Sequence, residues 1–185
     1  MDIFSHGLWA SAAAKGMNEK KQTKINLWFA AFWGMFPDLF AFGPATLWII
    51  WLRIQGKEII PIRPENADAL ERTGGGPFVL SHYLYNYSHS IFIFAGVLAV
   101  IMLVKYLFRH NVSWKNLPFV MLGWPLHILM DIPTHSYRFY PTPFLWPFSD
   151  WKFNGFSWGQ WWFILLNYGS LFLVFWLFRK KSTSK

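Results

Sequence analysis

Residues 25–52 form a long apolar stretch in which Asp38 is the only charged side chain. The hydrocarbon core of a bilayer, about 30 Å thick, takes about 20 helical residues, so this stretch predicts a membrane-spanning segment. Pro37, Gly43 and Pro44 interrupt it. Prolines are tolerated in membrane helices when neighbouring groups satisfy the freed carbonyls. The stretch therefore predicts either one broken span or two short pieces.

Three further apolar segments are long enough to cross a membrane: residues 90–108, 117–133 and 160–178. In the second of these, Asn116 offers an N-cap, Pro125 predicts a kink and Pro133 ends the helix. We therefore predict an all-α, polytopic integral membrane helical bundle of about four transmembrane helices, which forms one domain over residues 1–185.

The segments outside these spans are not predicted to cross the membrane. Residues 6–14 predict a short N-terminal helix too brief to span the membrane. Residues 53–76 contain prolines and three consecutive glycines, so they predict an extramembrane loop with a short helix over residues 64–72. Residues 134–158 are too irregular for a helix and too apolar for a free loop. We expect them to form an aromatic cap at the membrane interface.

Charge and composition support this interpretation. The chain is 54% hydrophobic and only 14% charged, whereas soluble domains are about one quarter charged. Its net charge of +8 comes from basic runs near residues 15–24, 105–115 and 179–185, which lie between apolar segments. By the positive-inside rule, these runs place both termini in the cytoplasm. They favour anionic lipid headgroups as partners over nucleic acid, and the sequence does not indicate an oligomeric state.

His127 and Asp131 are spaced four residues apart in one predicted helix, so their side chains share a face and can bind one ion. An imidazole nitrogen with a carboxylate oxygen suits zinc, manganese or iron, and the absence of cysteine excludes thiolate ligands. The alternative is a helix-terminal aspartate that accepts a hydrogen bond from the histidine. An ionisable residue in lipid is costly without a partner, which favours the metal interpretation.

Asp38 lies roughly thirteen residues from Ile25, which places it about 20 Å into the membrane at 1.5 Å per residue. A buried carboxylate at that depth needs a cation. The alternative is a protonated aspartate bonded to carbonyls that Pro37 frees.

The remaining histidines differ in context. His82 and His89 are seven residues apart and share a face with Tyr85 if this segment is helical. His89 begins a span and is the stronger ligand candidate. His135 follows the end of a predicted helix, where it can support the site or contact the substrate. His6, judged from its own segment only, is expected to be a surface residue.

Short motifs along most of the chain carry a family resemblance. They are Ser-His-Gly at 5–7, Phe-Pro-Asp-Leu at 36–39, Tyr-Ser-His-Ser at 87–90, Gly-Trp-Pro-Leu-His-Ile-Leu-Met-Asp-Ile-Pro-Thr-His at 123–135 and Leu-Trp-Pro-Phe at 145–148. This ordered set resembles the bacterial membrane-bound metal-dependent hydrolase family, which looks like a membrane-embedded relative of zinc-dependent phospholipase C. Such a resemblance implies a location in the bacterial inner membrane.

The resemblance implies a set of metal ligands: His6, Asp38, His89, His127 and Asp131. One departure concerns residues 84–86, where the family commonly has His-Arg-Gly and this chain has Leu-Tyr-Asn. That change removes residues associated with a second metal or with the usual substrate contact, and His82 is a candidate substitute.

These observations lead to a functional hypothesis. We expect a membrane-embedded hydrolase that uses a divalent metal, with zinc first and manganese or iron as alternatives, to attack a lipid or another membrane-associated ester or phosphoester through a metal-activated water. His82 and His135 are the candidate catalytic residues, with Asp38 an alternative proton acceptor to His82. Arg138 and Lys152 are candidates to hold an anionic headgroup, or else they are interfacial residues that snorkel.

Three other functions fit part of this pattern. An aspartate near the bilayer midplane beside interrupted helices also suits an ion-coupled or metal transporter. Paired histidines also suit a haem protein. A non-catalytic membrane scaffold that retains the fold is the third alternative.

Overall fold

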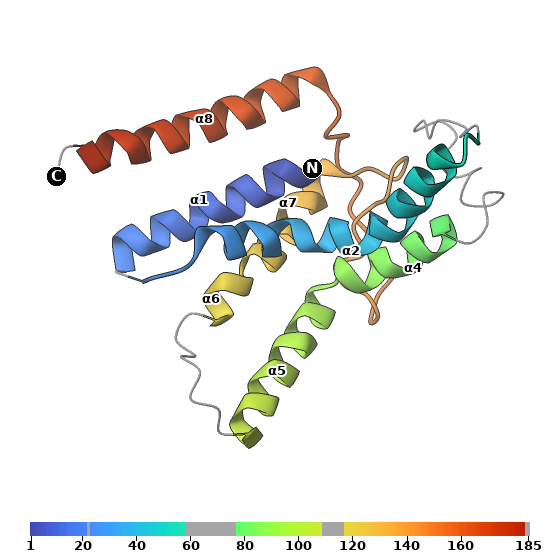
Figure 1. Cartoon of the computed structure of the whole chain (residues 1–185), viewed down its shortest axis with the longest axis horizontal. Helices are drawn as coiled ribbons and strands as arrows, with labels where there is room; N and C mark the ends of the chain where they lie inside the picture. Colours follow the sequence, from blue (N-terminus) through green and yellow to red (C-terminus); the bar gives the residue numbers. More distant parts are fainter. Residues whose placement is uncertain (22, 58–76, 109–116, 184–185) are drawn as a thin grey trace.

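The computed structural model describes residues 1–185 except 22, 58–76, 109–116 and 184–185. Over the described residues the regular structure is helical, with a single isolated β-bridge between Ser136 and Phe139. The helices are α1 (Ile3–Lys21), α2 (Leu27–Ile54), α4 (Pro77–Ser88), α5 (Ile91–Phe108), α6 (Leu117–Met121), α7 (Gly123–Thr134) and α8 (Trp161–Thr183). Helix α2 is central, because α1, α4 and α7 all pack against it (Figure 1).

Helix α2 is one continuous helix, which decides between the two predicted arrangements. The Asn26 side chain caps its start by accepting hydrogen bonds from the backbone N–H groups of Trp28 and Phe29 at 2.9 and 3.2 Å. Pro37 and Pro44 both lie inside it without ending it. Its buried face carries mostly small residues together with the one carboxylate: Ala30, Gly34, Pro37, Asp38, Ala41 and Ala45.

Three helices meet closely at Gly34. A Cβ atom added there would lie 2.6 Å from the carbonyl oxygen of His6 and 2.7 Å from the Cβ atom of Ala10, both on α1. A Cβ atom added at Gly123 of α7 would lie 2.6 Å from the backbone nitrogen of Gly34. Small residues allow such close backbone approach in membrane helix packing. This crossing brings α1 and α7 to the same part of α2 as Asp38.

The described residues contain fewer spans than the four predicted. Two of their helices are long and apolar enough to cross a membrane, Leu27–Ile54 and Trp161–Lys181, and a third span results if the pair Val79–Ser88 and Ile91–Leu107, bent by 67°, counts as one. The predicted span 117–133 is helical on both sides of a one-residue turn at Leu122, but its apolar helix Phe119–Thr134 is shorter than a candidate span. Pro125 makes no break because it lies in the first turn of α7, where backbone N–H groups have no helical partner anyway.

The N-terminal helix is longer than predicted. Residues 6–14 were expected to form a brief helix, whereas α1 extends over Ile3–Lys21 and lies along α2. The side chain of Asn18 closes the turn into α2 by bonding the backbone of Ile25. This hairpin returns the start of α1, and with it His6, to the middle of α2. The cytoplasmic placement of both termini stays a prediction.

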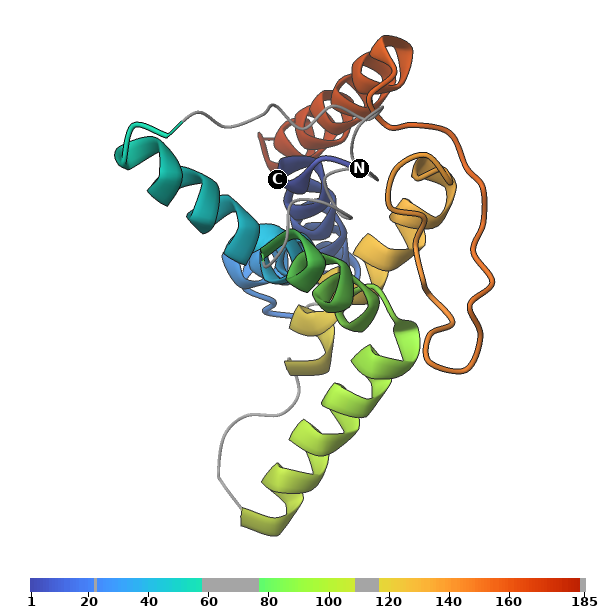
Figure 2. The same ribbon diagram turned by 90° about the vertical axis from the view of Figure 1, so that its right-hand side faces the viewer.

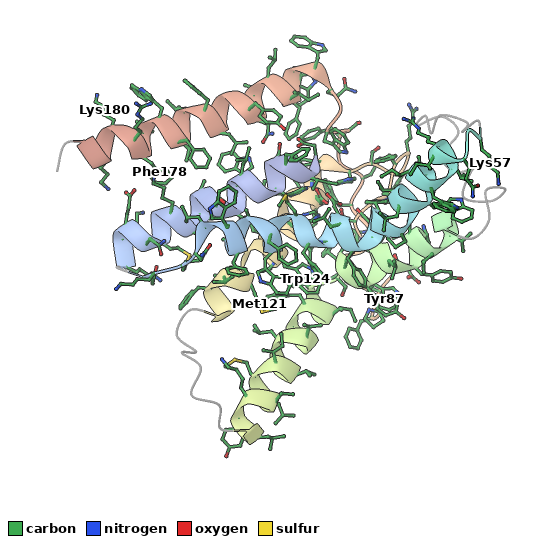
Figure 3. All side chains as sticks on the ribbon, viewed as in Figure 1. Lys57, Tyr87, Met121, Trp124, Phe178 and Lys180 are labelled. Carbon is green, nitrogen blue, oxygen red and sulfur yellow. The ribbon has the colours of Figure 1, made fainter. Side chains whose placement is uncertain are left out.

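Helix α8 runs alongside α1, and α5 points away from the other helices (Figures 1 and 2). The ammonium group of Lys15 lies 5.2 Å from the ring centroid of Phe178, which points from α8 towards α1 (Figure 3). A buried apolar cluster joins α5, α6 and α7 through Phe94, Met121, Trp124 and Ile128. Large apolar side chains remain exposed on α5 and α8, as expected of helices that face lipid.

The segment after α7 is irregular, as predicted for residues 134–158. It folds back on the end of α7 through hydrogen bonds from the backbone N–H groups of Gly155 and Phe156 to the carbonyls of His135 and Pro133, at 2.8 and 3.0 Å. Its other end reaches the junction of α4 and α5, where Ser90 Oγ donates to the carbonyl of Trp146. The segment therefore covers one end of the central helices. The short helix predicted over residues 64–72 lies outside the described residues.

Candidate metal centre

Four buried side chains from three parts of the chain converge on one point. Each of Asp38, His89, His127 and Asp131 offers one ligand atom, and these atoms lie within 4.8 Å of one another. Asp38 comes from the middle of α2, and His127 and Asp131 come from successive turns of α7. His89 lies at the bend between α4 and α5, so the bend itself turns this histidine inwards.

Hydrogen bonds orient both histidine rings. Nδ1 of His127 lies 2.7 Å from the carbonyl oxygen of Gly34, and Nδ1 of His89 lies 2.9 Å from Oγ of Ser88 and 3.2 Å from the carbonyl oxygen of Tyr85. A carbonyl oxygen can only accept, so Nδ1 of His127 carries a proton and donates it, whereas the Ser88 hydroxyl can donate to His89 or accept from it. In the neutral ring of His127, Nε2 is therefore left with a free lone pair. Metal-binding histidines typically use the same pattern.

The Nε2 atoms of His89 and His127 face each other and lie 3.0 Å apart. Oδ2 of Asp131 lies 3.0 Å from Nε2 of His127 and 3.5 Å from Nε2 of His89, and it has no hydrogen-bond partner among the described residues. Oδ1 of Asp38 lies 3.5 and 3.7 Å from the same two nitrogens. Four such atoms held this close need either a metal ion or a proton shared between them.

The spacing fits a first-row divalent metal. Two ligands bound at about 2.0 Å to a tetrahedral zinc ion lie about 3.3 Å apart, and the five ligand-atom separations just given for the histidines and Asp131 or Asp38 range from 3.0 to 3.7 Å. Two nitrogens and two carboxylate oxygens suit zinc, manganese or iron. The four residues therefore fit a divalent metal without fixing its identity.

His6 lies beside this group but faces the other oxygen of Asp131. Its Nε2 atom is 2.9 Å from Oδ1 of Asp131, and its ring stacks on that of His127 with centroids 3.6 Å apart. The α-amino group of Met1 also contacts this oxygen, at 2.5 Å. Burial, together with the nearby His127, lowers the pKa of His6 to about 4. The structure thus places His6 next to the four-residue group, and its role as a ligand stays a prediction.

His135 lies at the edge of the group beside a cavity. Its Nδ1 atom is 3.2 Å from the carbonyl oxygen and 3.4 Å from the Oδ1 atom of Asp131, so Nδ1 donates and Nε2 is left free. Burial lowers the pKa of His135 to about 4, so this ring is neutral at pH 7. Together with Asp38 it lines a cavity of about 370 Å³. A molecule in this cavity would contact both the buried carboxylate and a neutral imidazole.

The other predicted site residues lie farther out. His82 is exposed on α4, with its ring centroid 6.3 Å from that of Tyr140. Arg138 is exposed on the covering segment, and the carbonyl of Lys152 accepts a hydrogen bond from Tyr137 at 2.9 Å. None of the three belongs to the four-residue group or lines the cavity beside His135. Their predicted roles remain predictions.

Two residues that support the site were given no such role from the sequence. Gly34 supplies the carbonyl that orients His127. Tyr85 stacks on His89 with ring centroids 3.7 Å apart, and its hydroxyl donates to the carbonyl of Tyr140 at 2.9 Å. The sequence signal for Gly34 is the four-residue spacing from Ala30 through Gly34 to Asp38, which puts small residues and the carboxylate on one helix face.

Comparison with known proteins identifies the family of this chain. The family model described as YdjM inner membrane protein matches residues 1–184, so the chain belongs to that family. No curated protein and no solved structure matches it. Membership shows a membrane protein, in agreement with the apolar helices.

Proposed function

We propose that this member of the YdjM inner membrane protein family is a membrane-embedded, metal-dependent hydrolase that acts on a lipid or another membrane-associated ester or phosphoester. The observation that carries the proposal is the convergence of two histidine Nε2 atoms and two buried carboxylates beside a cavity. A divalent ion bound there would lower the pKa of a water towards 7 and polarise a carbonyl or phosphoryl oxygen.

The chain's own residues supply the remaining functions. Gly34 and Tyr85 orient the two histidine rings through their carbonyls. His135 lines the cavity as a neutral imidazole with a free Nε2 atom, so we assign it the role of proton acceptor. The covering segment 134–159 restricts access of water to these groups.

Two of the rival functions receive less support. A haem with two axial histidines places their nitrogens on opposite sides of the iron, about 4 Å apart at ordinary bond lengths, whereas those of His89 and His127 are 3.0 Å apart. Transporter sites near the midplane typically lie at discontinuous helices, whereas α2 is continuous past Asp38. A metal transporter remains the second candidate, because the buried group suits a cation in either case.

The test combines metal analysis with hydrolysis. We expect purified protein to contain close to one equivalent of a divalent metal and to hydrolyse a chromogenic ester or phosphodiester in detergent. His127→Ala and Asp131→Ala should lose both properties, and His82→Ala, which removes an exposed histidine, should retain the metal. Unchanged metal content in the first two variants would contradict the site. Metal flux into liposomes without hydrolysis would favour the transporter.

A further inference from the structure

The cavity beside Asp38 and His135 has an apolar wall. Six of its lining side chains are hydrophobic: Met1, Ile3, Phe4, Phe42, Phe139 and Trp158. Its volume of about 370 Å³ is in the range of small-molecule sites, which are mostly apolar with a few placed polar groups. Two of the three polar side chains of this cavity, Asp38 and His135, belong to or touch the candidate metal centre, and the third is Asp2. A bound molecule would therefore have its reacting end at the metal centre and an apolar part against the aromatic wall.

The position of the cavity along α2 indicates where that apolar part comes from. Asp38 and Phe42 lie about 17 and 23 Å from the start of a helix of 28 residues, at 1.5 Å per residue. If α2 crosses the membrane, both residues lie in the hydrocarbon region. Phe4 is 73% exposed, so this part of the lining also faces outwards. A lipid chain can reach such a cavity without entering water.

The charges around the cavity disfavour an anion. Of the described residues that line it, none is Lys or Arg, and two are acidic, Asp2 and Asp38. The α-amino group of Met1 lines it as well but is paired with Asp131. A divalent ion and the amino group would together carry three positive charges, and the carboxylates of Asp2, Asp38 and Asp131 carry three negative charges. The site has no surplus positive charge, so an ionised phosphate would lose its hydration without a compensating partner.

We propose that the cavity binds the acyl chain of an uncharged lipid and presents its carboxylic ester to Asp38 and His135. This inference rests on the proposed function and narrows its substrate class from esters and phosphoesters to neutral carboxylic esters. In the reaction, water adds to the ester carbonyl carbon, the bond from that carbon to the alkoxy oxygen breaks, and the alcohol leaves with a proton. The products are a fatty acid and the alcohol, and no oxidant or reductant is needed.

The experiment measures binding without turnover. Full-length protein in maltoside detergent is labelled with a hexadecyl glycerol ether that carries a diazirine in its chain, and the adducts are mapped by peptide mass spectrometry. We expect adducts at Phe42, Phe139 or Trp158. Unlabelled hexadecyl glycerol ether should compete at least about tenfold better than hexadecyl phosphate, because the loss of hydration of an ionised phosphate without a compensating partner costs more than the 1.4 kcal/mol of a tenfold change. Equal competition by the phosphate, or adducts elsewhere only, would overturn the proposal.

Filling variants provide the control. Ile3→Trp places a larger side chain in the cavity and should reduce labelling severalfold. Leu8 lies on the same helix but outside the cavity lining, so Leu8→Trp should leave labelling unchanged. Phe139→Trp fills the cavity from the irregular segment after α7. It replaces Ile3→Trp in the experiment if Ile3→Trp does not fold. Labelling is repeated on chelator-treated protein. Pocket labelling without metal or hydrolysis would reject the proposed function alone, whereas metal-dependent phosphodiester hydrolysis without pocket labelling would reject this inference alone.

Discussion

The Nε2 atoms of His89 and His127 lie 3.0 Å apart, although one residue is at the bend after α4 and the other is on α7. The His127 ring donates its Nδ1 proton to the carbonyl of Gly34, so its Nε2 presents a lone pair to the ring of His89. This contact is favourable when a metal ion lies between the rings or when a proton is shared between the two nitrogens. Metal binding and the stability of the fold should therefore be coupled.

The first prediction concerns this coupling. Adding a binding metal at one hundred times its Kd stabilises a protein by about 2.7 kcal/mol, which corresponds to a rise in Tm of roughly 5–10 °C at this size. Thermal unfolding of chelator-treated protein, with and without zinc or manganese, measures the shift. His89→Ala should abolish it, whereas His82→Ala should preserve it. Equal shifts in the two variants would show that the metal binds elsewhere.

The second prediction concerns the helix crossing at Gly34. Gly34→Ala should destabilise the protein by about 1–3 kcal/mol, because the new methyl group would overlap the backbone of α1. Gly43→Ala is the matched control, since it lies on the same helix and a Cβ atom there meets nothing within 4 Å. Thermal or denaturant unfolding in detergent compares the two. If both variants unfold at the same temperature or denaturant concentration as the wild type, the three helices are not packed as closely as described.

The sequence predicted which residues belong to the candidate site better than it predicted how they are arranged. The spacing of His127 and Asp131, and the depth of Asp38 in an apolar stretch, are local features, so they identified three of the four converging residues without knowledge of the fold. His89 was identified from its place at the start of a span. Of the five predicted ligands, these four form the group that the structure brings together, and His6 lies beside it.

The span count and the N-terminal helix depended on tertiary contacts. Residues 117–126 are apolar throughout, and hydropathy alone does not reveal the turn at Leu122. The return of α1 onto α2 depends on Gly34 and on the hydrogen bonds of Asn18, which have no hydrophobic period. For the same reason His6, which was expected at the surface when taken alone, lies 2.9 Å from Asp131.

The third prediction concerns Asn167, a buried polar residue on α8. Its side chain accepts from Nε1 of Trp9 at 2.8 Å and donates to Oγ of Ser5 at 2.7 Å, so it holds the start of α1 beside the site. Asn167→Leu removes both hydrogen bonds and leaves Nε1 of Trp9 without its acceptor, while Oγ of Ser5 keeps its bond to Asp2, so the change should cost about 1–3 kcal/mol of unfolding free energy. It should also weaken metal binding, because Ser5 precedes His6.

The neighbouring residue provides the control for Asn167→Leu. Tyr168→Phe removes one exposed hydrogen bond, from the hydroxyl to Oδ1 of Asp2 at 3.0 Å. Its cost should stay below about 1 kcal/mol, since solvent replaces the lost partner. Unfolding curves and zinc titrations of both variants test the difference. If Asn167→Leu is as stable as Tyr168→Phe, the polar contact between α8 and α1 does not position the site.

The fourth prediction concerns acid sensitivity of the metal-free protein. Burial lowers the pKa values of His6 and His135 to about 4, below the ordinary value of 6.5. Between pH 6.5 and 4 the unfolded chain binds more protons than the folded one, so the unfolding free energy falls as the pH falls. Each histidine can contribute up to about 3 kcal/mol across this window. His135→Gln should flatten the pH profile, and His82→Gln should not. A profile unchanged by His135→Gln would mean that this ring is already solvated when the protein is folded.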